Sequence, residues 1–171
     1  IVLDQNRGLG NGKLLPEGYL REPKSRLNRS TVIEHTKIAR AQRNMHLEIG
    51  QPYLLNPNSS TNTFDAKQYF NAVVGIGFPQ RFYQTLNKLG VNQYQAHEFP
   101  DHHDYEIADL SFGNSDAIIT TEKDAVKFKT LLKQHPEFNI PIWVVPVEAV
   151  LSSDCYDLLR QQLQQVGIQF S

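Results

Sequence analysis

The chain has 171 residues, 40% of them hydrophobic, and its 17 basic side chains nearly balance its 18 acidic ones. This length and apolar content allow a sizeable buried core, and the balanced charge excludes the overall basic field that nucleic-acid binding usually needs. We therefore expect no nucleic-acid partner. The single cysteine, Cys155, excludes an internal disulfide framework and favours a reducing compartment. The longest apolar stretch, residues 140–147, is far shorter than the roughly 20 residues of a membrane-spanning helix.

The first fifty residues are predicted to form short strands around a glycine-rich loop. Residues 1–4 have the pattern of a strand that ends in an acid, residues 8–12 contain three glycines, and residues 21–28 suit a short helical turn. No initiator methionine, polar tail or export leader comes first, so we expect the later part of a longer, cytoplasmic protein. Further strands are expected at residues 31–33, 45–49 and 53–55, with the last two as antiparallel neighbours.

From residue 72 onward, apolar runs of strand length alternate with amphipathic segments of helix length. This alternation predicts the α/β class, with a mostly parallel, helix-covered sheet in three α/β/α layers and a short antiparallel β-ribbon. The predicted strands cover residues 72–77, 94–99, 117–120 and 142–145, and the predicted helices cover residues 79–89, 107–111, 122–132 and 154–166.

Three polar loops are expected to share one edge of this sheet. Ligands of parallel sheets bind beyond the carboxyl ends of the strands, where the loops between strands and helices gather. Residues 75–81, 100–105 and 121–124 each follow a predicted strand. The sequence therefore predicts a candidate site at this edge.

The run Asp101-His-His-Asp104 is the densest group of reactive side chains in the chain. One histidine could act as a general base or keep a catalytic carboxylate in its active protonation state. The histidines and acids could instead ligate a metal, but four adjacent residues cannot complete a tetrahedral site without ligands from elsewhere. A third interpretation is structural: the acids cap the next helix and the imidazoles are exposed.

The run from Thr120 to Asp124 lies where a buried strand gives way to a helix. Thr121 suits the N-cap, and acids in the first turn suit the positive end of the helix dipole. Lys123 does not suit that end, so it suggests an anionic partner such as a phosphate or a carboxylate. A purely local role in starting the helix explains Asp124 equally well.

Other basic and glycine-rich segments have weaker functional interpretations. Arg21 and Arg26 offer two guanidinium groups on a short turn, where arginine could bind phosphate or simply face solvent. Arg81 lies in the first turn of a helix and could pair with acids of the neighbouring loop. Residues 8–14 lack the spacing of a nucleotide-binding loop, and Leu14 stands where serine or threonine would be needed.

Several short motifs, taken in chain order, resemble the C-terminal half of the tetraacyldisaccharide 4'-kinase family. The resemblance extends from the first strand to Val147, and its strongest marker is the run from Thr121 to Lys127. The motifs are Gly10-Asn-Gly12, Leu15-Pro16, Leu20-Arg-Glu-Pro23, Gly75-Ile-Gly77, Pro79-Gln-Arg-Phe82, Phe99-Pro-Asp-His102 and Thr121-Glu-Lys-Asp-Ala-Val-Lys127.

The resemblance implies ATP-dependent phosphorylation of the 4'-hydroxyl of a tetraacylated disaccharide 1-phosphate, a lipid A precursor. The enzyme would work in peripheral contact with the cytoplasmic face of the Gram-negative inner membrane. Two α/β lobes joined by a two-stranded ribbon are implied, with the ATP-binding loop and the Mg²⁺-binding acids in the first. Residues 1–50 would then end the nucleotide-binding lobe and connect it to the C-terminal lobe, residues 51–171. The sequence contains no Gly-x-x-x-x-Gly-Lys-Ser/Thr, so we expect this segment alone to be inactive.

The resemblance also implies roles for individual residues, none of them as a metal ligand. Asp101 and His102 are the catalytic candidates of the shared motif, and His102 would assist an aspartate base from the other lobe. Arg21 would meet a substrate or nucleotide phosphate, with Glu22 orienting it. The remaining residues assigned to the cleft are Asn11, Arg81, Lys123 and Asp124.

Two further functions stay open beside the kinase. Asp101-His102-His103 is similar to the triplet of a class of metal-dependent phosphoesterases, although their aspartate-x-aspartate element is absent. The chain could also be a ligand-binding module without catalytic function.

Overall fold

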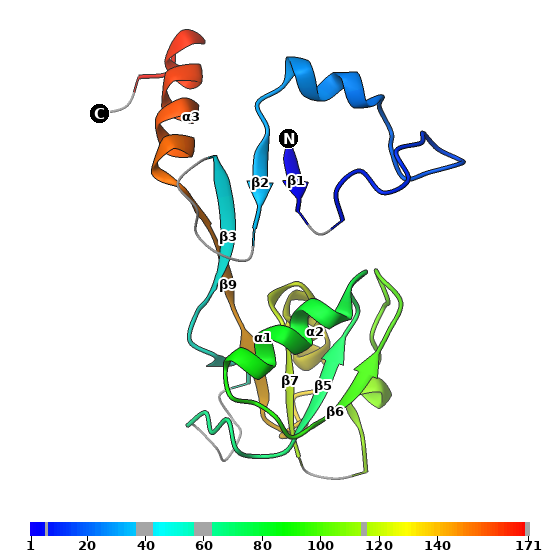
Figure 1. The fold of residues 1–171 in the computed structure, drawn as a ribbon. Coiled ribbons are helices and arrows are strands. Elements are labelled where there is room, and N and C mark those ends of the chain that lie inside the picture. The colour runs from blue at the N-terminus through cyan, green and yellow to red at the C-terminus, as the bar shows by residue number, and fades with distance from the viewer. Residues whose placement is uncertain (6, 37–42, 57–62, 114–115, 170–171) are drawn as a thin grey trace. The chain divides into compact units, whose positions relative to one another are not determined.

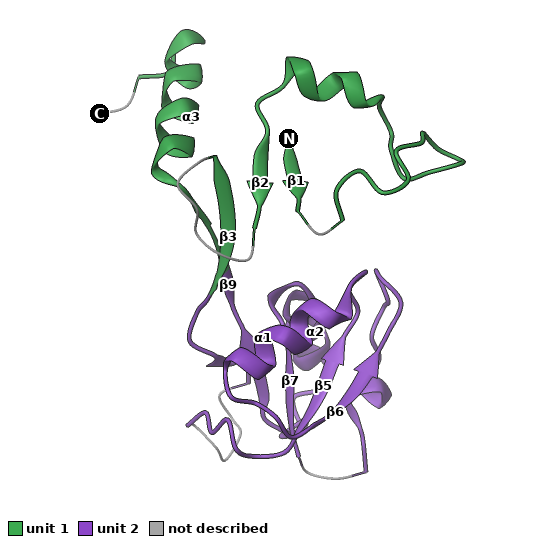
Figure 2. Ribbon diagram, in the orientation of Figure 1, with its two compact units in different colours: residues 1–48, 148–171 green, residues 49–147 purple. Residues whose placement is uncertain are grey.

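The computed structural model describes residues 1–5, 7–36, 43–56, 63–113 and 116–169. The chain divides into two compact units, which Figure 2 shows in different colours. Unit 1 comprises Ile1–Glu48 and Glu148–Ser171, and unit 2 comprises Ile49–Val147. The sequence placed residues 51–171 in a single lobe, whereas this division groups the C-terminal segment with the first residues of the chain.

Unit 2 contains a five-stranded sheet with the strand order β4-β8-β7-β5-β6, of which Figure 1 labels β7, β5 and β6. Strands β5 to β8 run parallel, and β4 pairs antiparallel with β8 at the edge. The strands are β4 (Tyr53–Leu54), β5 (Phe70–Val74), β6 (Tyr94–Glu98), β7 (Ala117–Thr121) and β8 (Ile142–Val145). The helices are α1 (Pro79–Lys88), the 3₁₀ helix η2 (Ile107–Leu110) and α2 (Glu122–Gln134).

Each face of this sheet is covered by its own apolar cluster. Alternate residues of a strand point to opposite faces. Phe82 and Leu86 of α1 pack against one face, and Phe128 and Leu131 of α2 pack against the other. These contacts confirm the predicted α/β fold with helices on both sides of a mostly parallel sheet.

Unit 1 contains most of a second sheet, in the order β1-β2-β3-β9. Strand β1 pairs parallel with β2, and β2 pairs parallel with β3. The elements are β1 (Val2–Asp4), the 3₁₀ helix η1 (Lys24–Arg29), β2 (Ile33–His35), β3 (Asn44–Ile49), β9 (Val147–Leu151) and α3 (Ser153–Gln165).

Strands β3 and β9 form an antiparallel ribbon; the sequence predicted a ribbon, but with residues 53–55 rather than β9 beside residues 45–49. Ser152 N donates to Asn44 O at one end of the pair, and Gly50 N donates to Pro146 O at the other. These bonds show that the two strands run in opposite directions.

Two local predictions were wrong. The expected pairing of residues 45–49 with residues 53–55 does not occur, because β3 lies between β2 and β9 while β4 pairs with β8. Alternating hydrophobicity reports half-burial but does not identify the partner strand. The helix expected at residues 107–111 is a shorter 3₁₀ helix, which begins with a capping box between Glu106 and Asp109.

Candidate functional site

The three loops predicted to share an edge do meet at the carboxyl ends of β5, β6 and β7. Gly75 N, just after β5, donates to Asp124 Oδ2 over 3.2 Å. A Cβ atom placed on Gly75 would lie 2.5 Å from Tyr105 Oη and 3.3 Å from Pro100 O. Strands β5 and β7 are neighbours whose following helices cover opposite faces, the arrangement that opens a crevice in α/β sheets.

Asp124 is the buried centre of this edge. Its side chain is fully buried, and Thr121 Oγ1 donates to Oδ2 over 2.8 Å while Tyr105 Oη donates to Oδ1 over 3.2 Å. The Thr121 hydroxyl also accepts the Asp124 N–H, which confirms the predicted N-cap of α2. Burial, reinforced by the Asp124 carboxylate, raises the pKa of the Tyr105 hydroxyl. Tyr105 is therefore a neutral donor.

Lys123 has the anionic partner that its position suggested, and that partner is a carboxylate of the protein. Its Nζ lies 2.5 Å from Asp101 Oδ1, with both side chains almost half exposed. The hydrogen bond from Lys123 is the main cause that lowers the pKa of Asp101. The contact joins the first turn of α2 to the loop after β6.

The adjacent histidines have different environments. His102 has φ 67°, a left-handed backbone conformation, and its side chain is 82% exposed, with Nε2 3.7 Å from Asp101 Oδ2. His103 Nε2 lies 2.9 Å from Asp109 Oδ2, and its ring stacks on Phe99 with centroids 4.7 Å apart. His102 is thus accessible to a substrate, whereas His103 is held by the protein.

Arg81 occupies the predicted first turn of α1. Its guanidinium carbon lies 5.8 Å from the centroid of the Phe78 ring, within the range of a cation–π contact. The pairing of Arg81 with acids of the neighbouring loop stays a prediction.

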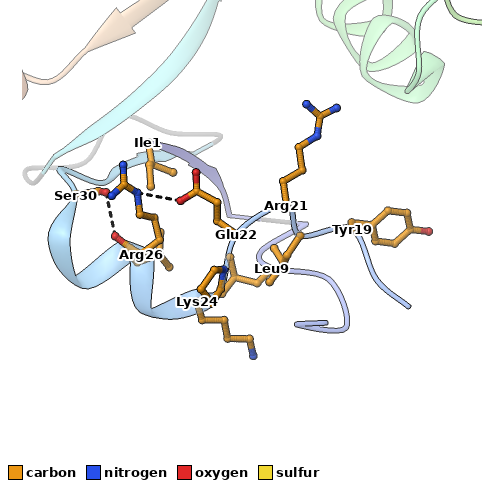
Figure 3. A pocket seen from close by; sticks show the side chains of 11 residues that line it. Ile1, Leu9, Tyr19, Arg21, Glu22, Lys24, Arg26 and Ser30 are labelled. Carbon is orange, nitrogen blue, oxygen red and sulfur yellow. Dashed lines mark hydrogen bonds and ion pairs between the residues drawn. The ribbon is translucent and has the colours of Figure 1, made fainter. Parts of the chain in front are cut away.

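The other predicted residues belong to unit 1. Asn11 closes a loop, because its side chain donates to Glu17 O over 2.8 Å and accepts from Lys13 N over 3.1 Å. Arg21 and Glu22 line a pocket of about 370 Å³, which Figure 3 shows from close by.

Glu22 pairs with Arg26 rather than with Arg21 in this structure. Glu22 Oε2 lies 3.0 Å from Arg26 Nε, one helical turn away, and the Arg21 side chain points away from this pair (Figure 3). The sequence analysis left Arg26 to bind phosphate or to face solvent and did not predict this pair, although a spacing of four residues from Glu22 is the usual spacing of such pairs.

Two residues that hold the loops at this edge were not predicted from the sequence. Tyr105 anchors the loop on Asp124, and Lys127 Nζ donates to His103 O over 2.6 Å. Lys127 was part of the noted run from Thr121, and its spacing of four residues from Lys123 places both on one face of α2. That spacing could have identified it.

Two features are absent from the part of the chain that the structure describes. No three histidine, cysteine, aspartate or glutamate side chains converge there in a group suited to a metal ion. None of the helices within it is long and apolar enough to cross a membrane.

Comparison with known proteins gives a consistent result. The sequence matches the family model described as tetraacyldisaccharide-1-P 4'-kinase over residues 1–164. A tetraacyldisaccharide 4'-kinase of Psychrobacter arcticus is 37% identical, in a match that covers all of this chain and 54% of that protein. One from Halorhodospira halophila is 39% identical, over 86% of this chain and 43% of the relative.

The fold is also similar to a solved structure. A crystal structure of LpxK from Aquifex aeolicus in complex with ATP superimposes with a TM-score of 0.62 and 20% identity, covering 98% of this chain and 51% of that one. The chain spans about half the length of the first curated relatives it matches. Family model, relatives and fold agree: the chain belongs to the tetraacyldisaccharide 4'-kinase family, and it fits the C-terminal half.

Proposed function

We propose that this chain is the C-terminal part of an ATP-dependent kinase that phosphorylates the 4'-hydroxyl of tetraacyldisaccharide 1-phosphate in lipid A biosynthesis. The observation that carries the proposal is the family match, joined to an accessible His102 at the carboxyl edge of the sheet. The enzyme would act in peripheral contact with the cytoplasmic face of the inner membrane.

Phosphoryl transfer depends mainly on positioning and on stabilising charge, so a second lobe contributes by aligning the reacting groups. In this proposal the His102 imidazole assists an aspartate base that the N-terminal half supplies. Asp101 lies beside it and holds Lys123. Arg21 offers its guanidinium to a phosphate of the substrate or of ATP, and Glu22, paired with Arg26, shapes the same pocket.

We assign ATP and Mg²⁺ to the N-terminal half. The chain has no Gly-x-x-x-x-Gly-Lys-Ser/Thr, and its described acids and histidines form no cluster suited to a metal. In this proposal the residues of this chain do not hold Mg²⁺, and the chain alone is inactive.

The contacts of Asp101, His102 and His103 argue against a joint metal site of the phosphoesterase kind. Asp101 binds Lys123 and His103 binds Asp109, while the His102 side chain extends into solvent. Asp101 Oδ2 does lie 3.7 Å from His102 Nε2, whereas His103 Nε2 is bonded to Asp109.

A transfer assay distinguishes the functions. This chain preceded by an N-terminal half of the family, called the completed kinase below, is incubated with ATP, Mg²⁺ and tetraacyldisaccharide 1-phosphate, and labelled phosphate on the lipid is measured. We expect transfer at the 4'-hydroxyl. No transfer would favour a binding module, and hydrolysis of a generic phosphodiester with Mn²⁺ by the dialysed chain would favour a phosphoesterase.

A further inference from the structure

Three side chains in the first two turns of α2 bind the loop that carries His102. Lys123 Nζ donates to Asp101 Oδ1 over 2.5 Å, and Lys127 Nζ donates to His103 O over 2.6 Å. The loop is thus bonded to α2 on both sides of His102.

The third side chain, Asp124, anchors the end of the same loop. It accepts the Tyr105 hydroxyl at Oδ1, and the Tyr105 ring packs edge-on against Phe128 with centroids 4.8 Å apart. Because Asp124 is fully buried and also accepts from Gly75 N, it ties this anchor to the end of β5. Thr121 Oγ1 and Gly75 N donate to Oδ2, and the Tyr105 hydroxyl donates to Oδ1, which would be costly to leave buried without a donor.

The loop needs such support because of its backbone. His102 has φ 67°, a conformation that residues other than glycine seldom adopt and that persists where surrounding contacts enforce it. The His102 side chain itself is 82% exposed. Contacts on the residues beside it therefore hold the backbone from which the imidazole extends.

Lys123 alone would weaken α2, because a cation in the first turn opposes the helix dipole. Its contact with Asp101 explains why a lysine stands there. Lys127 lies one turn later on the same face, and its Nζ also approaches the Tyr105 ring at 5.7 Å from the centroid.

We propose that Lys123, Asp124 and Lys127 are positioning residues that hold residues 101–105 against α2 and so present the His102 imidazole at the edge of the sheet. The inference rests on the proposed function of His102 for its catalytic consequence. In this proposal Lys123 and Asp124 bind the loop rather than a phosphate.

The first test measures the loop in this chain by amide hydrogen exchange. The informative amide is that of His103, whose N–H is bonded to Pro100 O over 3.0 Å. In the double variant Lys123→Met/Lys127→Met we expect its exchange to become faster by roughly tenfold or more, because the opening equilibrium loses two charged hydrogen bonds. The matched control is Lys129→Met, an exposed lysine of the same helix. Unchanged exchange in the double variant would overturn the proposal.

Asp124→Asn and Tyr105→Phe extend the test to the buried anchor. Asp124→Asn could prevent folding, whereas Tyr105→Phe removes only the hydroxyl that reaches Asp124. We expect Tyr105→Phe to speed exchange of the His103 amide while the amides of β7 stay protected. Equal exchange in Tyr105→Phe and in the unmodified chain would remove the anchor from the proposal.

The second test measures kinetics in the completed kinase. We expect the lysine double variant to lower kcat between roughly 10-fold and 100-fold with little change in the KM for ATP, because misplacing a reacting group mainly affects the chemical step. Lys123→Arg/Lys127→Arg keeps both donors and should restore most of kcat.

Two outcomes would contradict the account. If the lysine double variant exchanges faster but keeps its kcat, while His102→Asn lowers kcat, the positioning role is overturned. An unchanged kcat in His102→Asn would instead overturn the proposed function, and the exchange result would still decide whether these residues hold the loop.

Discussion

At the scale of single residues, adjacent histidines in one loop have opposite environments. His103 is held by Asp109 and by the Phe99 ring, whereas the His102 side chain is exposed. Residue types alone predicted the reactive loop but did not separate the two, because the distinction depends on Asp109, six residues away; the family resemblance assigned a role only to His102. It also could not identify Asp101 as the partner of Lys123, a contact across 22 residues.

His102→Asn in the completed kinase should lower turnover by roughly 10²-fold or more, the usual scale for assistance in proton transfer. Asparagine suits this test because it tolerates the left-handed backbone that His102 adopts, so the loop should keep its shape. Steady-state transfer to the lipid measures the effect, and thermal unfolding checks the fold. A rate equal to that of the unmodified enzyme would exclude His102 from the mechanism.

Arg21→Ala should weaken the binding of substrate or nucleotide with the fold intact, because Arg21 lines the unit 1 pocket and its guanidinium points away from the Glu22–Arg26 pair. The measurement is KM for each substrate of the completed kinase. Arg7→Ala, at an exposed arginine of the same unit, is the matched control. Normal constants in Arg21→Ala, or an equal change in the control, would count against this role.

Asp101 should titrate at a lower pH than an ordinary aspartate. The hydrogen bond from Lys123 lowers its pKa from the usual 3.8, so the pair is fully formed above 3.8 and is lost as the pH falls through the lower folded value. Carboxyl-carbon NMR titration of the chain measures the midpoint. In Lys123→Met it should move up toward 3.8, and identical midpoints in both proteins would refute the pairing in solution.

At the scale of elements, the sequence predicted most strands and helices of unit 2 because its apolar runs are long and end at clear capping residues. Thr121 begins α2 as expected. The pairing of β3 with β9 was missed because these strands lie about 100 residues apart and local patterns do not specify distant partners. The meeting of three loops was predictable, since it follows from the direction of parallel strands.

Gly75→Ala tests the packing of β5 against these loops. The new Cβ would lie 2.5 Å from Tyr105 Oη and 3.2 Å from Asp124 Oδ1, and the Tyr105 ring is confined by Phe99 and Phe128. We expect a loss of about 1–3 kcal/mol in the free energy of unfolding, the usual cost of overpacking.

Gly77→Ala is the matched control for that substitution. Among the described residues other than its chain neighbours, only Asp101 Oδ2 would come within 4 Å of the new Cβ, at 3.8 Å, so the unfolding free energy should change by less than about 0.5 kcal/mol. Urea unfolding of both variants measures the difference. Equal stability of the two would show that the loops do not pack on Gly75 as described.

At the scale of the whole molecule, the chain fits the C-terminal half of a family of kinases and spans about half of its first curated relatives. We expect the chain alone to show no ATP hydrolysis above buffer, because it contains no nucleotide-binding loop of the Gly-x-x-x-x-Gly-Lys-Ser/Thr kind. A phosphate-release assay with ATP and Mg²⁺ measures this. Hydrolysis that survives repeated purification would place a nucleotide site within these residues.

The most direct test of the account is the position of the His102 imidazole in the completed kinase with Mg²⁺ and a non-hydrolysable ATP analogue. A crystal structure of the closed complex should place this ring within hydrogen-bond reach, about 2.6–3.2 Å or one water, of the aspartate base. That base should in turn face the terminal phosphate. A closed complex that leaves the His102 ring in solvent, away from both groups, would contradict the account.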